Sequence, residues 1–232
     1  RRYNGRVSID HNLFKNVQVG ANVIYSYVDR DNRYSPLNQA RKLIPISKPY
    51  DDEGNIVLYP SPGYNTQMNP LIDNEPGMRE DNTIRERFFG TLYLNWNITK
   101  DLFFRTTFAW KSINSRRGFY AAKESLQGGD VDSQSYKEHQ IQRELTWENV
   151  LTWTKDFAKV HNIQLMAGTS TIMNTDEYTK ASGKDQPYGD NLFHNLASNE
   201  KEIAIDSYLN EQNLVSFFGR VNYKLMERYL LT

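Results

Sequence analysis

The sequence predicts an all-β protein, and in particular an up-and-down antiparallel transmembrane β-barrel segment of about eight strands. Three observations support this prediction. Apolar and polar residues alternate over long stretches, as they do in strands with one apolar and one polar face. These stretches occur in pairs joined by short turns, and long irregular segments separate the pairs. Short turns at one end and long loops at the other are typical of outer-membrane barrels.

The composition excludes several other classes of protein. The chain carries 28 Lys and Arg against 28 Asp and Glu, so no net charge draws it to nucleic acid. The aromatic content of 13% argues against disorder, and the absence of cysteine excludes disulfides and thiolate metal sites. No segment approaches the ~20 apolar residues of a membrane helix, whereas a membrane-spanning strand needs only ~10.

Four strand pairs follow one another along the chain. The alternation predicts strands of ~11 to 13 residues, about the length of a tilted span of a bilayer. The paired segments are residues 3–13 with 17–27, 87–96 with 102–111, 141–153 with 163–170, and 213–224 with 229–232. The segments between the pairs, which we expect to be irregular outer loops, are residues 29–84, 115–139 and 173–212.

The first of these loops has local structure of its own. Ser35 and Pro36 suit the start of a short helix, which would run to about Leu43 before Pro45 stops it. The acidic run that begins at Asp51 predicts a turn inside a small hairpin. It does not predict a calcium site, because the alternating ligands of a calcium loop are missing. A loop this long on a rigid scaffold usually carries function.

Alternation also divides the side chains of each strand between two faces. We expect one face to meet membrane lipid, with residues Val19, Val23, Leu92, Leu94, Phe104, Phe108, Leu165 and Val221. We expect the other face to line a wet lumen, with Gln142 and the charged residues Arg87, Arg105, Glu144, Glu148 and Arg220. Aromatic belts should lie at Trp96, Trp153 and Tyr223 near the short turns, and at Tyr25, Tyr27 and Trp110 near the loops. Arg143 shares the parity of the apolar face and should therefore sit at its upper rim.

One stretch near the end of the chain resembles a known family. The residues from Ser216 to Tyr223 read SFFGRVNY, and after a short charged turn the chain continues as Arg228-Tyr229-Leu230-Leu231-Thr232. This hairpin is similar to the barrel signature of the SusC/RagA family of TonB-linked outer-membrane proteins of Bacteroidetes. Weaker matches are Pro45 with the segment from Tyr50 to Asn55, the triplet Asn69-Pro70-Leu71, and the strand pair from Arg87 to Trp110.

The resemblance implies a fold and a function for a longer protein. Members of the family close a ~22-stranded barrel around an N-terminal plug. Residues 1–232 would then be a partial barrel domain of a TonB-dependent receptor, without the plug, the signal peptide and the C-terminal strands. The whole protein would lie in the cell outer membrane and import oligosaccharides or peptides. TonB would supply the energy, and a SusD-like lipoprotein would serve as an extracellular lid.

Nothing in the sequence predicts an enzyme, a cofactor or a metal site. The four histidines have no metal-ligand spacing, and Ser182-Gly183-Lys184 lacks the upstream glycine of a phosphate loop. Glu144 and Glu148 lie ~13 Å apart along one strand, too far for paired carboxylate chemistry. Aromatic rings beside amides and carboxylates suit sugar or peptide recognition, so the substrate-contact candidates are the loop residues Tyr34, Tyr50, Tyr59, Tyr64, Tyr120 and Tyr188.

Two other interpretations use the same features. A soluble β-sandwich that serves as a carbohydrate-binding or adhesion module would keep the aromatic loops and dispense with the membrane. Strand length and the asymmetry between turns and loops argue against it. An outer-membrane barrel enzyme would need a nucleophile with a base and an orienting group on neighbouring strands, and no such set is present in the sequence.

Overall fold

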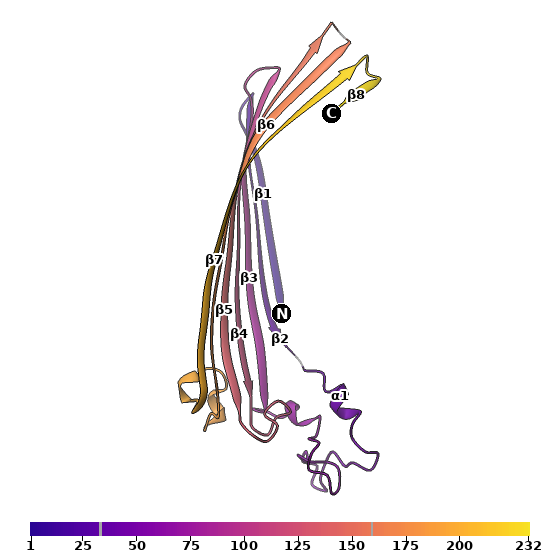
Figure 1. Cartoon of the computed structure of the whole chain (residues 1–232), viewed down its shortest axis with the longest axis vertical. Coiled ribbons are helices and arrows are strands. Elements are labelled where there is room, and N and C mark those ends of the chain that lie inside the picture. Colours follow the sequence, from indigo (N-terminus) through magenta and orange to yellow (C-terminus); the bar gives the residue numbers. More distant parts are fainter. Residues whose placement is uncertain (33, 159) are drawn as a thin grey trace.

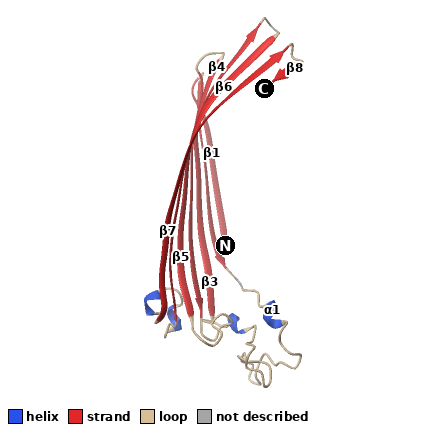
Figure 2. Cartoon of the chain, in the orientation of Figure 1, coloured by secondary structure: helices blue, strands red, loops and turns tan. Residues whose placement is uncertain are grey.

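The computed structural model describes residues 1–32, 34–158 and 160–232, and these residues form one tall antiparallel sheet (Figures 1 and 2). Within them eight strands lie side by side in sequence order, and no second sheet is present. The strands are β1 (Arg2–Phe14), β2 (Val17–Asp31), β3 (Arg79–Asn97), β4 (Leu102–Ala121), β5 (Gln134–Phe157), β6 (His161–Lys184), β7 (Lys201–Leu225) and β8 (Tyr229–Leu231). Short helical turns occur in the loops: α1 (Leu37–Ala40), η1 (Ile72–Asn74), η2 (Gly189–Asn191) and η3 (Leu196–Ser198). Among the described residues, no helix has the length and apolar character to cross a membrane.

The predicted up-and-down order is confirmed. Short connections join β1 to β2, β3 to β4, β5 to β6 and β7 to β8, and all of them lie at one end of the sheet (Figure 1). The three long connections, residues 32–78, 122–133 and 185–200, lie at the opposite end. Because one continuous sheet holds every described strand, the alternative of two sheets packed face to face does not describe this chain.

The strands are longer than the sequence predicts. β5 and β6 each have 24 residues, about 80 Å at the usual rise per residue. The segments that we expected in loops but that belong to β2, β3, β4, β5, β6 and β7 are residues 29–31, 79–84, 115–121, 134–139, 173–184 and 201–212. In β3 to β6 the prediction failed because both faces of the extensions carry mainly polar residues, so the hydrophobic alternation fades while the backbone pairing continues. In β7 the alternation of Ile203, Ile205 and Leu209 with polar neighbours persists, and the prediction did not use it.

Strand register separates the side chains into two faces. Ile9, Ala21, Leu92, Phe108 and Trp147 are paired in succession across β1 to β5, so they share one face, which we call the apolar face. All eight residues expected to meet lipid have the parity of this face. The opposite parity defines the polar face, which carries Arg87, Arg105, Gln142, Glu144, Glu148 and Arg220.

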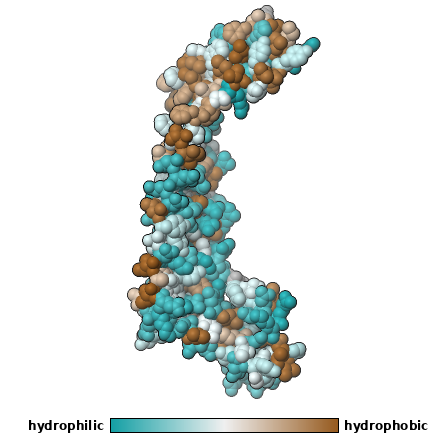
Figure 3. All heavy atoms as spheres, in the orientation of Figure 1, coloured by the Kyte–Doolittle hydropathy of each residue, from teal (hydrophilic) through white to brown (hydrophobic). Residues whose placement is uncertain are grey.

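Apolar residues on the apolar face are concentrated toward the short turns. On β4 and β5 they run from the pair Leu102 and Trp153 to the pair Trp110 and Leu145, and we call this region the apolar band. It covers about the 9–11 residues that a tilted strand needs to cross a bilayer. The surface in Figure 3 is brown at the end with the short turns and mostly teal along the stem and at the loops.

The aromatic belts agree with the prediction at one edge of the band and differ at the other. Trp96, Trp153 and Tyr223 lie near the short-turn ends of β3, β5 and β7, as expected. Trp110 marks the other edge of the band but lies in the middle of β4, which continues to Ala121. Tyr25 lies likewise within β2, so this belt follows the edge of the apolar band and not the strand ends.

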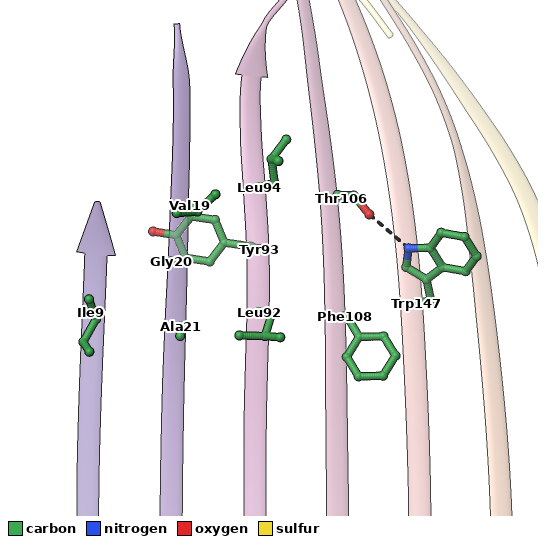
Figure 4. Close-up of a pocket in the computed structure, with 10 residues that line it drawn as sticks. All are labelled: Ile9, Val19, Gly20, Ala21, Leu92, Tyr93, Leu94, Thr106, Phe108 and Trp147. Carbon is green, nitrogen blue, oxygen red and sulfur yellow. Dashed lines mark hydrogen bonds between the residues drawn. The ribbon is translucent and has the colours of Figure 1, made fainter. Parts of the chain in front are cut away.

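A hollow of about 600 Å³ lies on the apolar face within the band (Figure 4). Leu92, Phe108 and Trp147 line it, and small Ala21 forms part of its floor. The indole Nε1 of Trp147 donates a hydrogen bond to Thr106 Oγ1 at 3.0 Å, which satisfies the one polar atom of that ring. The lining of the hollow is therefore mainly apolar, at a depth where lipid would meet it.

The enclosed core is small and lies at the loop end. Tyr120, Ala122 and Phe193 form it, with Met78 and Leu192 packed against them. A Cβ atom at Gly118 would lie 2.2 Å from the Phe193 ring, so glycine is needed for this ring to sit on the sheet. The third loop is thereby held against the apolar face, beyond the band.

The first long loop is held together by Asn69. This side chain is fully buried, and its Nδ2 donates hydrogen bonds to the carbonyls of Pro49 and Val57 at 2.8 and 2.9 Å. The expected helix is shorter than predicted, because α1 ends at Ala40 instead of Leu43. The expected hairpin is reduced to one bridge between Tyr50 and Ile56, closed by an acidic turn.

Candidate functional site

The polar face carries a ladder of charged and amide side chains along the whole height of the sheet. Near the short turns, Tyr93 reaches across β2 and donates its hydroxyl hydrogen bond to Asp10, two strands away. Its ring passes over Gly20, where a Cβ atom would lie 2.4 Å from both Tyr93 and Asp10 (Figure 4). The guanidinium of Arg105 lies 5.3 Å from the centre of the same ring. Glycine in β2 thus permits a contact that joins β1, β3 and β4.

Farther along the polar face, a shallow hollow of about 230 Å³ is lined by charged and amide groups. Lys111 Nζ lies 3.3 Å from Glu144 Oε2, and both side chains are about two-fifths exposed. Asp176 accepts hydrogen bonds from Gln140 and Gln142 at 2.9 and 3.2 Å. These groups offer donors and acceptors in alternation, the arrangement that binds hydroxyl or peptide groups.

At the loop end of the polar face, beyond the apolar band, a buried carboxylate holds two arginines. Arg117 donates to both carboxylate oxygens of Asp81, Nε to Oδ1 at 2.9 Å and a terminal nitrogen to Oδ2 at 3.0 Å. Arg79 donates to Oδ2 from the other side at 3.0 Å. Burial acts to raise the pKa of Asp81, but hydrogen bonds from Arg117 and Asn32 outweigh it and hold the pKa below its ordinary value.

Aromatic rings surround these two arginines. Phe119 and Tyr136 stack with their ring centres 4.8 Å apart. The Arg117 guanidinium and the Lys180 ammonium lie 5.4 and 4.5 Å from the Tyr136 ring centre. Burial raises the pKa of Tyr136 to about 12, so its hydroxyl stays neutral. The cluster is cationic and aromatic, and it lies on the polar face next to the long loops.

The six loop tyrosines fall into two groups. Tyr188 is 74% exposed, and Tyr34, Tyr50 and Tyr64 are also exposed. Tyr59 is half-buried and donates its hydroxyl hydrogen bond to Asp130 at 2.9 Å, which connects two loops. Tyr120 is only 3% exposed and packs in the core, although it lines a hollow of about 720 Å³ between the loops. Substrate contact by these residues remains a prediction.

The five charged residues expected in the lumen share the polar face but do not form one site. Glu144 is paired in register with Lys111, whereas Arg105 lies six residues from Lys111 along β4 and is paired with Val150. Glu148 accepts a hydrogen bond from Ser170 at 3.5 Å. The cluster of Asp81, Arg79 and Arg117 was missed, because its residues fall where irregular loops were expected. The one signal for it was the pair of charged residues Arg79 and Asp81 at alternate positions, which a search for alternating apolar residues does not detect. Arg117 lies 36 residues from Asp81 in the sequence.

The histidines and carboxylates give no metal centre in the described part of the chain, where no three such side chains come close enough together. His161 Nδ1 lies 2.6 Å from the hydroxyl of Tyr223, and His139 Nε2 lies 2.7 Å from Asn114 Oδ1. In each of these two histidines, one ring nitrogen is thus hydrogen-bonded to a side chain of a neighbouring strand.

Comparison with known proteins shows relatives of one kind. No model of a known protein family matches the sequence. TonB-dependent receptor P3 of Formosa agariphila is 31% identical over 154 residues, which are 66% of this chain and 15% of that protein. TonB-dependent receptor P26 of the same organism is 23% identical over 239 residues, covering 100% of this chain and 23% of that protein. The chain therefore spans less than a quarter of the length of these curated relatives.

Solved structures agree in fold. The RagAB peptide transporter matches with a TM-score of 0.78 at 16% identity, over 97% of this chain and 26% of that one. The RagAB peptide importer in its "open-open" state matches with a TM-score of 0.76 over the same shares. These relatives are receptors and a transporter and not enzymes. Sequence and fold together confirm the resemblance to the SusC/RagA family: the chain is similar to a stretch of the barrel wall of a TonB-dependent receptor.

Proposed function

We propose that this chain is part of the wall of an outer-membrane active transporter that imports oligosaccharides or peptides. The observation that carries the proposal is the division of one tall sheet into an apolar face with a band of membrane-spanning height and a polar face opposite it. A wall of this kind separates lipid from water. In the proposal the apolar band meets lipid, and Arg87, Arg105, Glu144, Glu148 and Arg220 line the lumen.

The proposal gives this chain one part of a larger task. Residues 1–232 would supply part of a barrel domain, and a plug, a TonB-contacting segment and further strands would belong to the rest of a longer protein. The lengths of the curated relatives support this division, because the chain matches 15% and 23% of them. Energy would come from the TonB complex, as the names of the two curated relatives suggest.

Recognition would take place at the loop end. Loops on a rigid scaffold commonly carry binding, and the exposed rings of Tyr34, Tyr64 and Tyr188 offer flat apolar faces there. A SusD-like lipoprotein would cover this end as a lid, and the first loop, residues 32–78, would contact substrate or lid. The name of RagAB supports peptides as one substrate class, and the aromatic and amide side chains suit glycans equally.

The first test is removal of the loop tip. Deleting residues 51–62 from the intact transporter should impair uptake and leave barrel assembly intact, because no strand of the sheet is touched. Uptake of labelled peptide and oligosaccharide mixtures by whole cells measures the effect. If uptake continues at the normal rate, the loop has no part in recognition.

A second pair of variants separates recognition from loop order. The deletion also removes the carbonyl of Val57, to which Asn69 donates. Tyr34→Ala with Tyr64→Ala keeps these bonds and should reduce uptake, whereas Asn69→Ala disorders the loop without removing a ring. Normal uptake in the tyrosine variant, together with reduced uptake in Asn69→Ala, would contradict direct contact by these rings.

A further inference from the structure

Four basic residues gather on the apolar face just beyond the apolar band. Arg143 is paired with Ser112, in the next same-face pair beyond Trp110 and Leu145. Arg116 is paired with His139, and Lys137 is paired with Gly118. Both pairs lie on the same face, farther from the short turns than Arg143. Arg116, Lys137, His139 and Arg143 thus form a basic patch on β4 and β5, on the side that carries the band and not on the side of the lumen.

The cations of this patch have no acidic partners. Among residues 1–32, 34–158 and 160–232, none of Arg116, Lys137 and Arg143 forms an ion pair, and all three are exposed. On the polar face, Lys111 and Arg117 are each paired with a carboxylate, whereas Arg87, Arg105 and Arg220 have no ion pair among the same described residues. The patch therefore keeps its positive charge available for an outside anion.

Acidic residues flank the patch without neutralising it. On the same face, Glu86 of β3 accepts hydrogen bonds from Tyr25 and Asn114 at 3.3 and 3.2 Å, and Glu177 of β6 is paired in register with Ile141. Positive charge is thus concentrated in a column two strands wide.

Part of the patch lines a hollow of about 600 Å³ under the third loop. Arg116, Lys137, His139 and His194 contribute cationic or imidazole groups, and the apolar lining includes Ile84, Ala181 and Phe193. Two acids also line it: Glu80, and Glu138, whose carboxylate lies 4.0 Å from Lys180. Phe193, seated over Gly118, holds the loop against the sheet and so maintains the hollow.

We propose that the basic patch binds phosphate groups of lipids in the outer leaflet of the membrane. The inference rests on the proposed membrane position of the apolar band. Arg and Lys bind phosphate strongly, and basic pockets beside a membrane-spanning region bind anionic headgroups. The hollow of Leu92, Phe108 and Trp147, which extends from β1 to β5 within the band, lies on the same face and suits acyl chains (Figure 4). Positive charge above hydrocarbon on one wall is complementary to a phosphorylated amphiphile.

The test compares two charge variants of the intact receptor in nanodiscs of phosphatidylcholine containing lipid A. Arg116→Gln/Lys137→Gln/Arg143→Gln should lower the affinity for lipid A on the order of a hundredfold, since each cation near a headgroup strengthens binding about fivefold. Arg85→Gln/Arg87→Gln/Arg220→Gln removes the same charge from the polar face and should retain lipid A as the wild type does. Native mass spectrometry counts the bound lipid, and heat-modified gel mobility checks that each barrel is folded.

Dephosphorylated lipid A provides the second arm of the experiment. It should bind the wild type and the patch variant equally weakly, because the phosphate is the group recognised. Equal retention of phosphorylated lipid A by the wild type and the patch variant would overturn the proposal, as would equal binding of the two lipids. A wild-type receptor missing from the outer-membrane fraction would instead contradict the proposed function, so the two failures are distinguishable.

Discussion

Arg117 of β4 and Asp81 of β3 form a two-bonded ion pair at the loop end of the polar face, at 2.9 and 3.0 Å. The Asp81 side chain is 2% exposed, and that of Arg117 is 38% exposed. The same carboxylate also holds Arg79, so one buried negative charge fixes two cations and the ends of two strands. This arrangement holds the aromatic rings of Phe119 and Tyr136 beneath the loops.

Replacing Asp81 with Asn should loosen this end of the sheet. The substitution leaves two cations with no buried partner, and because Arg117 is partly exposed we expect a cost of about 2 kcal/mol instead of the full cost of a buried pair. Amide hydrogen exchange of residues 79–83 and 115–121 should accelerate, while exchange within the apolar band stays unchanged. Uniform acceleration over the whole sheet would show that the pair supports the entire fold.

The contribution of Asp81 should depend on pH in a defined direction. Its pKa is lower in the folded protein than in the unfolded chain, so the stabilisation is present above the unfolded value of about 4 and is lost as pH falls through the folded value. The difference in exchange protection between wild type and Asp81→Asn should therefore begin to shrink as pH falls below about 4, and it should vanish once pH is below the folded pKa of Asp81. A difference that persists there unchanged would assign the effect to packing instead of charge.

Substituting Gly20 should disturb the contact between β1 and β3. Alanine would place a methyl group 2.4 Å from the Tyr93 ring and from Asp10, which forces the ring away at a cost of about 1–3 kcal/mol. Gly5→Ala is the matched control, because no heavy atom lies within 4 Å of its added Cβ. Thermal unfolding of the detergent-solubilised receptor measures both. Equal stability of the two variants would mean that Tyr93 can move without loss.

Loss of the hydrogen bond between Trp147 and Thr106 should reduce stability only when the indole N–H is present. Thr106→Val leaves the indole N–H without a partner in hydrocarbon and should cost about 1 kcal/mol. The same change made in a Trp147→Phe background should cost almost nothing, because no polar atom is then left unpaired. Unfolding in lipid bilayers by denaturant gives the two differences. Identical costs in both backgrounds would show that this wall region is hydrated.

How far the sequence predicts this fold depends on hydrophobic alternation. Leu92, Phe108 and Val221 alternate with polar neighbours, so strand identity and facing follow from period two within the apolar band. Beyond Trp110 the β4 residues Ser112, Asn114 and Arg116 are polar on the apolar face as well, and the signal ends while the strand continues to Ala121. Backbone pairing, which has no side-chain signature, extends the sheet there.

The candidate site was predicted less completely for a related reason. Asp81 and Arg117 are 36 residues apart in sequence, and only strand register brings them together. Tyr120 was expected to contact substrate, but its side-chain parity and the third loop place it in a small core. The exposed Tyr34, Tyr64 and Tyr188 follow the simpler rule that loop aromatics stay at the surface.

The two faces of β4 provide the most direct test of the whole account. The chain has no cysteine, so Phe108→Cys and Thr107→Cys each add one thiol for a spin label, at neighbouring positions and nearly equal depth. In a bilayer, lipid-dissolved oxygen should relax the label at Phe108, and an aqueous nickel chelate should relax the label at Thr107. Equal access of the nickel chelate to both labels would contradict a wall that separates lipid from water.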